Sequence, residues 1–226
     1  MFRVLRVGIV AGALVLAGIA ASVSASSTPA AHDHANADAA RKSSAAAFRA
    51  DMRQLWEEHI VWTRQYIVSA ATLDTDLPDI GPTANRLFAN QADIGNAIAA
   101  FYGNAAGQQL TALLTDHIAI AADAITQAKQ GNDAGLQAAL DRWYANADDI
   151  AAFLAQANPV NWPEEAMRAH MRGHLDLTLA EAVARLSGDY AADIKAYDQV
   201  HEQILEMADM LSSGIIAQFP ARFNHS

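Results

Sequence analysis

The stretch NAAGQQLTALLTDHIAIAADAITQAKQGN, residues 104–132, decides the fold of this chain. Its large apolar side chains recur at spacings of three and four residues, which is the pattern of one buried helix face. Asn104 suits the N-cap of a helix, Gly131 suits its end, and Asn132 suits the cap of the next helix. Two long helices joined by so short a connection lie antiparallel to each other. The stretch therefore predicts a helical hairpin with His117 on its apolar face.

The same pattern continues on both sides of this stretch. It predicts long helices over residues 44–72, 104–130, 132–157, 163–187 and 189–219, and a shorter helix over 83–101. The 226 residues include 52 Ala but only 12 Gly and 6 Pro, and alanine has the highest helix propensity. The predicted fold is all-α, an up-and-down antiparallel bundle of five long helices and one shorter helix. We expect one domain over residues 48–220, a tail over 221–226, and no internal sequence repeat beyond the helical period.

The N-terminal residues 1–25 have the features of a Sec-type signal peptide. Arg3 and Arg6 precede an apolar run, and small residues lead to a cleavage site near Ala25. The alternative is a retained membrane anchor, which would be the one source of membrane contact. Cleavage predicts an exported protein, in the periplasm, the cell wall or outside the cell, with a net charge of −12.

Residues 26–47 contain no large apolar side chain and predict a flexible leader. His32 and His34 lie in this leader, where two imidazoles can capture copper or zinc weakly. A solvated tail with histidines present by chance is the alternative.

The composition excludes several classes of function. The absence of cysteine excludes disulfides, thiolate zinc sites, iron–sulfur clusters and cysteine nucleophiles. The acidic balance argues against nucleic acid as a partner, because phosphates need a basic surface. No glycine-rich phosphate loop, G-x-S-x-G elbow or H-E-x-x-H motif occurs. Catalytic residues are therefore not predicted, and whether the protein is an enzyme stays open.

Four histidines, each in a different predicted helix, form the candidate site: His59, His117, His174 and His201. Three of them lie on the apolar stripe of their helix, and His174 lies at the edge of its stripe. Each lies within about two residues of its helix midpoint, a spread in height of roughly 3 Å. Because midpoints of antiparallel helices coincide, the four imidazoles should form one buried layer. A shared site is favoured, since four separately buried imidazoles would each need a partner.

The donor set suggests which cofactor the layer would bind. Imidazole is a ligand for zinc, copper, nickel and iron, so a transition metal is expected. Two imidazoles could instead hold a haem iron, with Met171 or Met207 as an axial substitute. A di-iron carboxylate centre is less favoured, because the required Glu-x-x-His pairs are missing. Four further side chains are candidates for orienting the imidazoles or for replacing a ligand: Glu58, Asp116, His170 and Asp198.

Two other interpretations of these residues remain. The first is a non-enzymatic binding or scaffold module of the cell envelope, whose core histidines form a hydrogen-bonded, pH-sensitive network. The second is a redox or hydrolytic metalloenzyme, which needs an open coordination position. The ligand or partner, beyond a metal or small molecule, and the oligomeric state are not predicted. Five aromatic residues are interpreted as core, with a ligand pocket as the alternative: Trp56, Trp62, Tyr66, Trp143 and Tyr144.

Several strings of sequence carry a resemblance to other proteins. They include WEEHIVWTR at residues 56–64, NQADIGN at 90–96 and WYANAD at 143–148. The chain resembles a widespread bacterial family of small, often secreted, all-helical proteins, over roughly residues 48–223. The resemblance implies a helical fold, and it implies no reaction or site residue, because no activity is established for that family.

Overall fold

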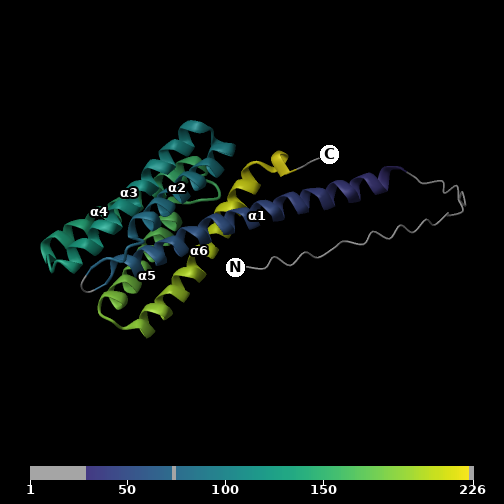
Figure 1. Ribbon diagram of the computed structural model, residues 1–226. Helices are drawn as coiled ribbons and strands as arrows, with labels where there is room; N and C mark the ends of the chain where they lie inside the picture. The colour runs from purple at the N-terminus through teal and green to yellow at the C-terminus, as the bar shows by residue number, and fades with distance from the viewer. Residues whose placement is uncertain (1–28, 73–74, 224–226) are drawn as a thin grey trace, which may run out of the picture.

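The computed structural model describes residues 29–72 and 75–223 (Figure 1). These residues form six α-helices and a final 3-10 helix: α1 Pro29–Ala70, α2 Ile80–Tyr102, α3 Asn104–Lys129, α4 Asp133–Ala157, α5 Glu164–Leu186, α6 Tyr190–Gln218 and η1 Pro220–Phe223. No strand occurs within the described ranges. The prediction of an all-α fold is therefore confirmed.

The helices form a closed bundle. Each helix packs against its neighbours in sequence, and α6 packs back against α1. Short connections make successive helices antiparallel; the shortest is Gly103 alone, whose φ of 88° is accessible to glycine at little cost. It follows that α1, α3 and α5 run in one direction, while α2, α4 and α6 run in the other.

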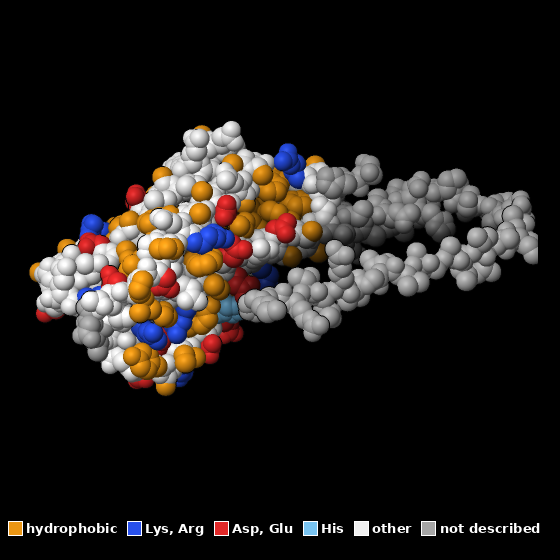
Figure 2. Space-filling model, in the orientation of Figure 1, with side chains coloured by type: hydrophobic (Ala, Val, Ile, Leu, Met, Phe, Trp, Pro, Cys, Tyr) orange, Lys and Arg blue, Asp and Glu red, His pale blue; other side chains and the backbone are white. Residues whose placement is uncertain are grey.

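The core lies inside this closed bundle. Every helix contributes a side chain that is almost completely buried, and one from each is Ile60, Leu87, Leu114, Ile150, Leu175 and Ile204. Burial of side chains of this size contributes about 1.5–3 kcal/mol each to the hydrophobic stabilisation. On the face seen in Figure 2, acidic and basic side chains are interspersed. None of the described helices is both long enough and apolar enough to span a bilayer.

The N-terminal part of the structure differs from the prediction. Helix α1 begins at Pro29, so residues 29–47 are helical where a flexible leader was expected, and this part extends beyond the other helices (Figure 1). The high helix propensity of the many alanines explains the difference, and Ala45 and Phe48 already contact the core. The signal peptide predicted over residues 1–25 lies outside the described residues.

Candidate functional site

The structure brings three of the four predicted histidines together in the interior. His59 of α1, His117 of α3 and His174 of α5 are 2%, 2% and 3% exposed. The imidazole centroid of His174 lies 5.8 Å from that of His59 and 6.3 Å from that of His117. These three residues, called the histidine cluster below, lie side by side as the common height of their helix midpoints predicts.

His201 lies outside this cluster, and the prediction that it shares the buried layer is wrong. Its side chain is 37% exposed, and its Nε2 lies 2.9 Å from Oε1 of Glu57 on α1. Helix α6 buries Val200 and Ile204 instead. One residue along a helix is a rotation of about 100°, so the neighbour of Val200 lies on the flank of α6 rather than on its inward face.

Each histidine of the cluster is paired with a carboxamide on the next helix. In every pair the imidazole Nδ1 faces the amide oxygen: His59 with Gln91 at 3.2 Å, His117 with Asn146 at 2.9 Å, and His174 with Gln203 at 3.2 Å. Sequence reasoning missed these three amides, because Asn and Gln are mostly surface residues. The imidazoles are thus oriented from α2, α4 and α6 respectively.

The amide nitrogens decide which imidazole nitrogen carries the proton. Each amide donates an N–H to a backbone carbonyl: Gln91 to Leu87 at 2.8 Å, Asn146 to Leu113 at 3.0 Å, and Gln203 to His170 at 3.2 Å. The amide oxygen must therefore face the imidazole, where it accepts from Nδ1–H. The proton lies on Nδ1, and Nε2 keeps a lone pair.

The three histidine–amide pairs recur along the chain at a nearly constant interval. The histidines are 58 and 57 residues apart, and the amides are 55 and 57 residues apart. Each pair belongs to one helical hairpin, α1–α2, α3–α4 or α5–α6. The bundle therefore consists of three similar hairpins that meet at the histidine cluster. The sequence analysis expected no internal sequence repeat and did not use this regular spacing of His and Asn or Gln.

Burial keeps the three imidazoles neutral. Desolvation lowers the pKa of His117 to about 3, with a further contribution from His174. Desolvation likewise lowers the pKa of His174 to about 4, although its hydrogen bond with Gln203 acts in the opposite direction. The pKa of His59 lies well below its ordinary value because of burial and, secondarily, the two neighbouring histidines. All three are neutral near physiological pH, which is the state in which imidazole binds metals.

Two tryptophans flank the cluster. The ring centroid of Trp56 lies 5.8 Å from that of His59, and the ring centroid of Trp143 lies 5.4 Å from that of His117. The indole Nε1 of each is buried and has no hydrogen-bond partner among the described residues. A buried donor of this kind is satisfied by water or by a bound group in most proteins. Both tryptophans, expected as core, are indeed buried.

The acidic residues proposed as partners of the imidazoles lie elsewhere. Glu58 pairs with Arg86 on α2. Asp116 lines a shallow surface pocket together with Arg142, and the side chain of Asp198 is exposed. His170 is half-buried, and its carbonyl accepts the hydrogen bond from Gln203. Glu58 and Asp116 each precede a cluster histidine by one residue and therefore point about 100° away from it.

The histidines of the cluster are spaced more widely than the ligands of a metal site. Two imidazoles that bind one tetrahedral ion at 2.0–2.1 Å have centroids roughly 5 Å apart. The observed separations of 5.8 and 6.3 Å would have to shrink by about 1 Å. As they stand, no three His, Asp or Glu side chains among those that the structure describes, in residues 44–72 and 75–223, are spaced to coordinate a metal ion.

Comparisons of the chain with protein-family models, with curated proteins and with solved structures found no match. The fold and the site define a closed six-helix bundle with a histidine cluster at its centre. The function is therefore argued from these residues and their contacts.

Proposed function

We propose that the protein binds one transition-metal ion through the Nε2 atoms of His59, His117 and His174. One observation carries this proposal: every Nδ1–H in the cluster is committed to an amide oxygen, which leaves Nε2 as the acceptor nitrogen of three buried, neighbouring imidazoles. Metal-binding histidines commonly donate their other N–H to a fixed partner in this way. Three neighbouring lone pairs are poorly suited to an apolar interior, but they suit a cation.

The ligand chemistry favours an ion such as zinc, copper, nickel or iron, each of which accepts imidazole. Three protein ligands leave at least one coordination position for water or another molecule, as in reactive zinc sites. Haem is less well supported. The cavity beside the cluster holds about 70 Å³, whereas pockets for molecules the size of a drug hold about 300–1,000 Å³.

The proposal retains export of the protein. Its support is the sequence: two arginines, an apolar run and small residues near Ala25 precede the helical domain. The mass of the protein isolated from its native host tests this, because cleavage after Ala25 and retention of residues 1–25 give different masses.

Metal titration of the mature, metal-free protein tests the metal site. We expect one Zn²⁺ or Co²⁺ per chain, and loss of tight binding in His117→Leu, which removes one ligand while filling its space. The matched control is His201→Leu, which removes a histidine outside the cluster and should leave binding unchanged. Circular dichroism verifies that both variants are folded. Equal binding by the wild type and His117→Leu would contradict the proposal.

A second candidate function is a binding or scaffold module with a buried polar network. It is favoured by the fact that all three histidines are hydrogen-bonded to amide side chains of the neighbouring helices. In that case the titration would show no stoichiometric binding. Because burial lowers the pKa of His117 to about 3 and that of His174 to about 4, such a network would respond to acid rather than near neutrality.

A further inference from the structure

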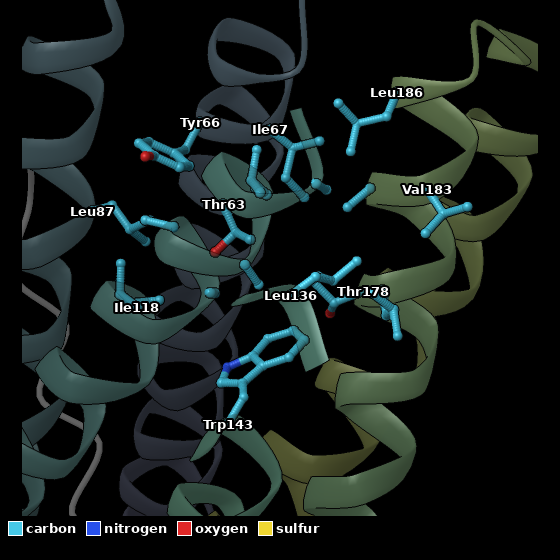
Figure 3. A pocket seen from close by; sticks show the side chains of 17 residues that line it. Thr63, Tyr66, Ile67, Leu87, Ile118, Leu136, Trp143, Thr178, Val183 and Leu186 are labelled. Atoms are coloured by element: carbon cyan, nitrogen blue, oxygen red, sulfur yellow. The ribbon is translucent and has the colours of Figure 1, made fainter. Parts of the chain in front are cut away.

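An apolar cavity of about 70 Å³ lies one helical turn from the histidine cluster (Figure 3). Each helix of the cluster contributes the residue four positions after its histidine: Thr63, Ala121 and Thr178. Trp143 also lines the cavity and contacts the imidazole of His117, with ring centroids 5.4 Å apart. The cavity and the cluster are therefore neighbours that share a wall.

The cavity is apolar although two threonines line it. The hydroxyl of Thr63 donates to the carbonyl of His59 at 2.8 Å, and that of Thr178 donates to the carbonyl of His174 at 2.9 Å. Both hydroxyls are thus bonded to the backbone of their own helices. Most of the remaining wall consists of aliphatic side chains such as Ile67 (Figure 3). A cavity of this character stays dry and takes up apolar molecules.

The cavity reaches the surface near the C-terminal end of α5. Val183 lines it and is nevertheless 55% exposed. Leu186 on α5 and Leu136 on α4 also line the cavity, and Leu136 lies between Thr178 and Trp143 (Figure 3). Val183 therefore marks the part of the lining that lies nearest to solvent.

The size of the cavity limits what it can hold. A water molecule takes up about 30 Å³ in the liquid, so about 70 Å³ accommodates a molecule of two or three heavy atoms. Charged molecules are disfavoured because the wall is almost entirely apolar and offers little to replace their water.

We propose that this cavity binds a small, uncharged, apolar molecule, of the size of dioxygen, and holds it beside the histidine cluster. The inference rests on the proposed function to this extent: an ion bound by three imidazoles keeps an open coordination position, and the cavity would supply the molecule that occupies it. Binding to the cavity itself does not require the ion.

Xenon binding to the metal-free mature protein, followed by xenon NMR, tests the cavity. We expect saturable binding by the wild type and its loss in Ala182→Leu, which fills the cavity. Ala196→Leu is the matched control, because Ala196 is as buried as Ala182 but lies on α6, away from the lining. Saturable binding by Ala182→Leu, or none by the wild type, would overturn the inference.

Two further measurements test the cavity if Ala182→Leu does not fold and separate the cavity from the metal site. If Ala182→Leu does not fold, Leu136→Ala enlarges the cavity and should increase xenon uptake; no increase would overturn the inference. In the Co²⁺-loaded protein, xenon held about one turn, or about 6 Å, from the cluster should be broadened by the paramagnetic ion. Xenon binding without any Co²⁺ binding would leave the cavity standing and remove the metal site, so the two failures are distinguishable.

Discussion

Asn146 links two groups in the interior: it accepts from Nδ1–H of His117 and donates to the carbonyl of Leu113. This arrangement holds the imidazole in one orientation and one tautomer. Gln91 and Gln203 do the same for the other two histidines. At the scale of the residue, the amides therefore determine that Nε2, rather than Nδ1, is the atom free to bind.

Replacing Asn146 with leucine should weaken metal binding. The Asn146→Leu variant removes the acceptor for Nδ1–H of His117, and loss of such a partner commonly lowers metal affinity about 10–100-fold. Competition with a chromophoric chelator measures the Zn²⁺ affinity. The control is Asn158→Leu, which removes a similarly buried amide at the C-terminal end of α4 that is bonded to the carbonyl of Gly214. An equal loss of affinity in both variants would count against the assigned role.

The lowered pKa values of the cluster predict a loss of stability in acid. The unfolded histidines bind protons near their ordinary pKa of about 6.5, whereas the folded ones stay neutral down to a pKa of about 4 for His174 and about 3 for His117. The free energy of unfolding should therefore fall as pH falls below about 6.5, by about 1.4 kcal/mol per pH unit for each histidine.

Urea unfolding from about pH 7 to about pH 5 measures this slope. We expect His117→Leu to reduce the slope, while His201→Leu leaves it unchanged. Glu181 acts in the opposite sense: burial raises its pKa to about 6, so its contribution is present in acid and is lost as pH rises through that value. Glu181→Gln removes this contribution. An unchanged slope in His117→Leu would show that the buried imidazoles do not control the acid response.

At the scale of the element, the close crossing of α2 and α3 depends on two glycines. A Cβ added to Gly107 would lie 2.6 Å from the carbonyl oxygen of Gly95 and 2.6 Å from Cβ of Ala99. Both contacts are too short for real atoms, so the helices would have to move apart. The hairpins α1–α2 and α3–α4 are thus joined at a place where only glycine fits.

Gly107→Ala should destabilise the protein by about 1–3 kcal/mol, the usual cost of overpacking. Gly173→Ala is the matched control, because Gly173 is also inside a helix but an added Cβ there meets nothing within 4 Å. That variant should instead be stabilised by about 0.5–1 kcal/mol, because alanine loses less conformational entropy than glycine. Denaturant unfolding compares the two, and a stabilised Gly107→Ala would contradict the close packing.

Some features of the helices could be predicted from the sequence and others could not. The apolar spacing around His59, His117 and His174 predicted helices and a common height, because both depend on local geometry that the sequence contains. The same spacing led to the wrong prediction that His201 points inward. The inward face of a helix inferred from apolar spacing can be wrong by one residue, which is a rotation of about 100°. The sequence analysis missed the early start of α1. It treated the absence of large apolar side chains as a sign of a flexible segment and gave too little weight to the high helix propensity of alanine.

At the scale of the whole molecule, the bundle consists of three hairpins around one cluster. The pairing of each histidine with its amide could not be predicted from neighbouring residues. Each amide lies 29 or 32 residues from its histidine and on another helix: Gln91, Asn146 and Gln203. Closure of α6 on α1 likewise depends on packing between distant parts of the chain. The nearly constant interval between the histidines was nevertheless present in the sequence and is the feature that links all three hairpins.

X-ray absorption spectroscopy of the Zn²⁺-loaded mature protein tests the central claim most directly. The account predicts three imidazole nitrogens at about 2.0–2.1 Å from the metal. In His201→Leu the spectrum should be unchanged, and in His117→Leu the number of imidazole ligands should fall. A spectrum dominated by water and carboxylate oxygens, or one that is the same in His117→Leu, would contradict a metal site built from His59, His117 and His174.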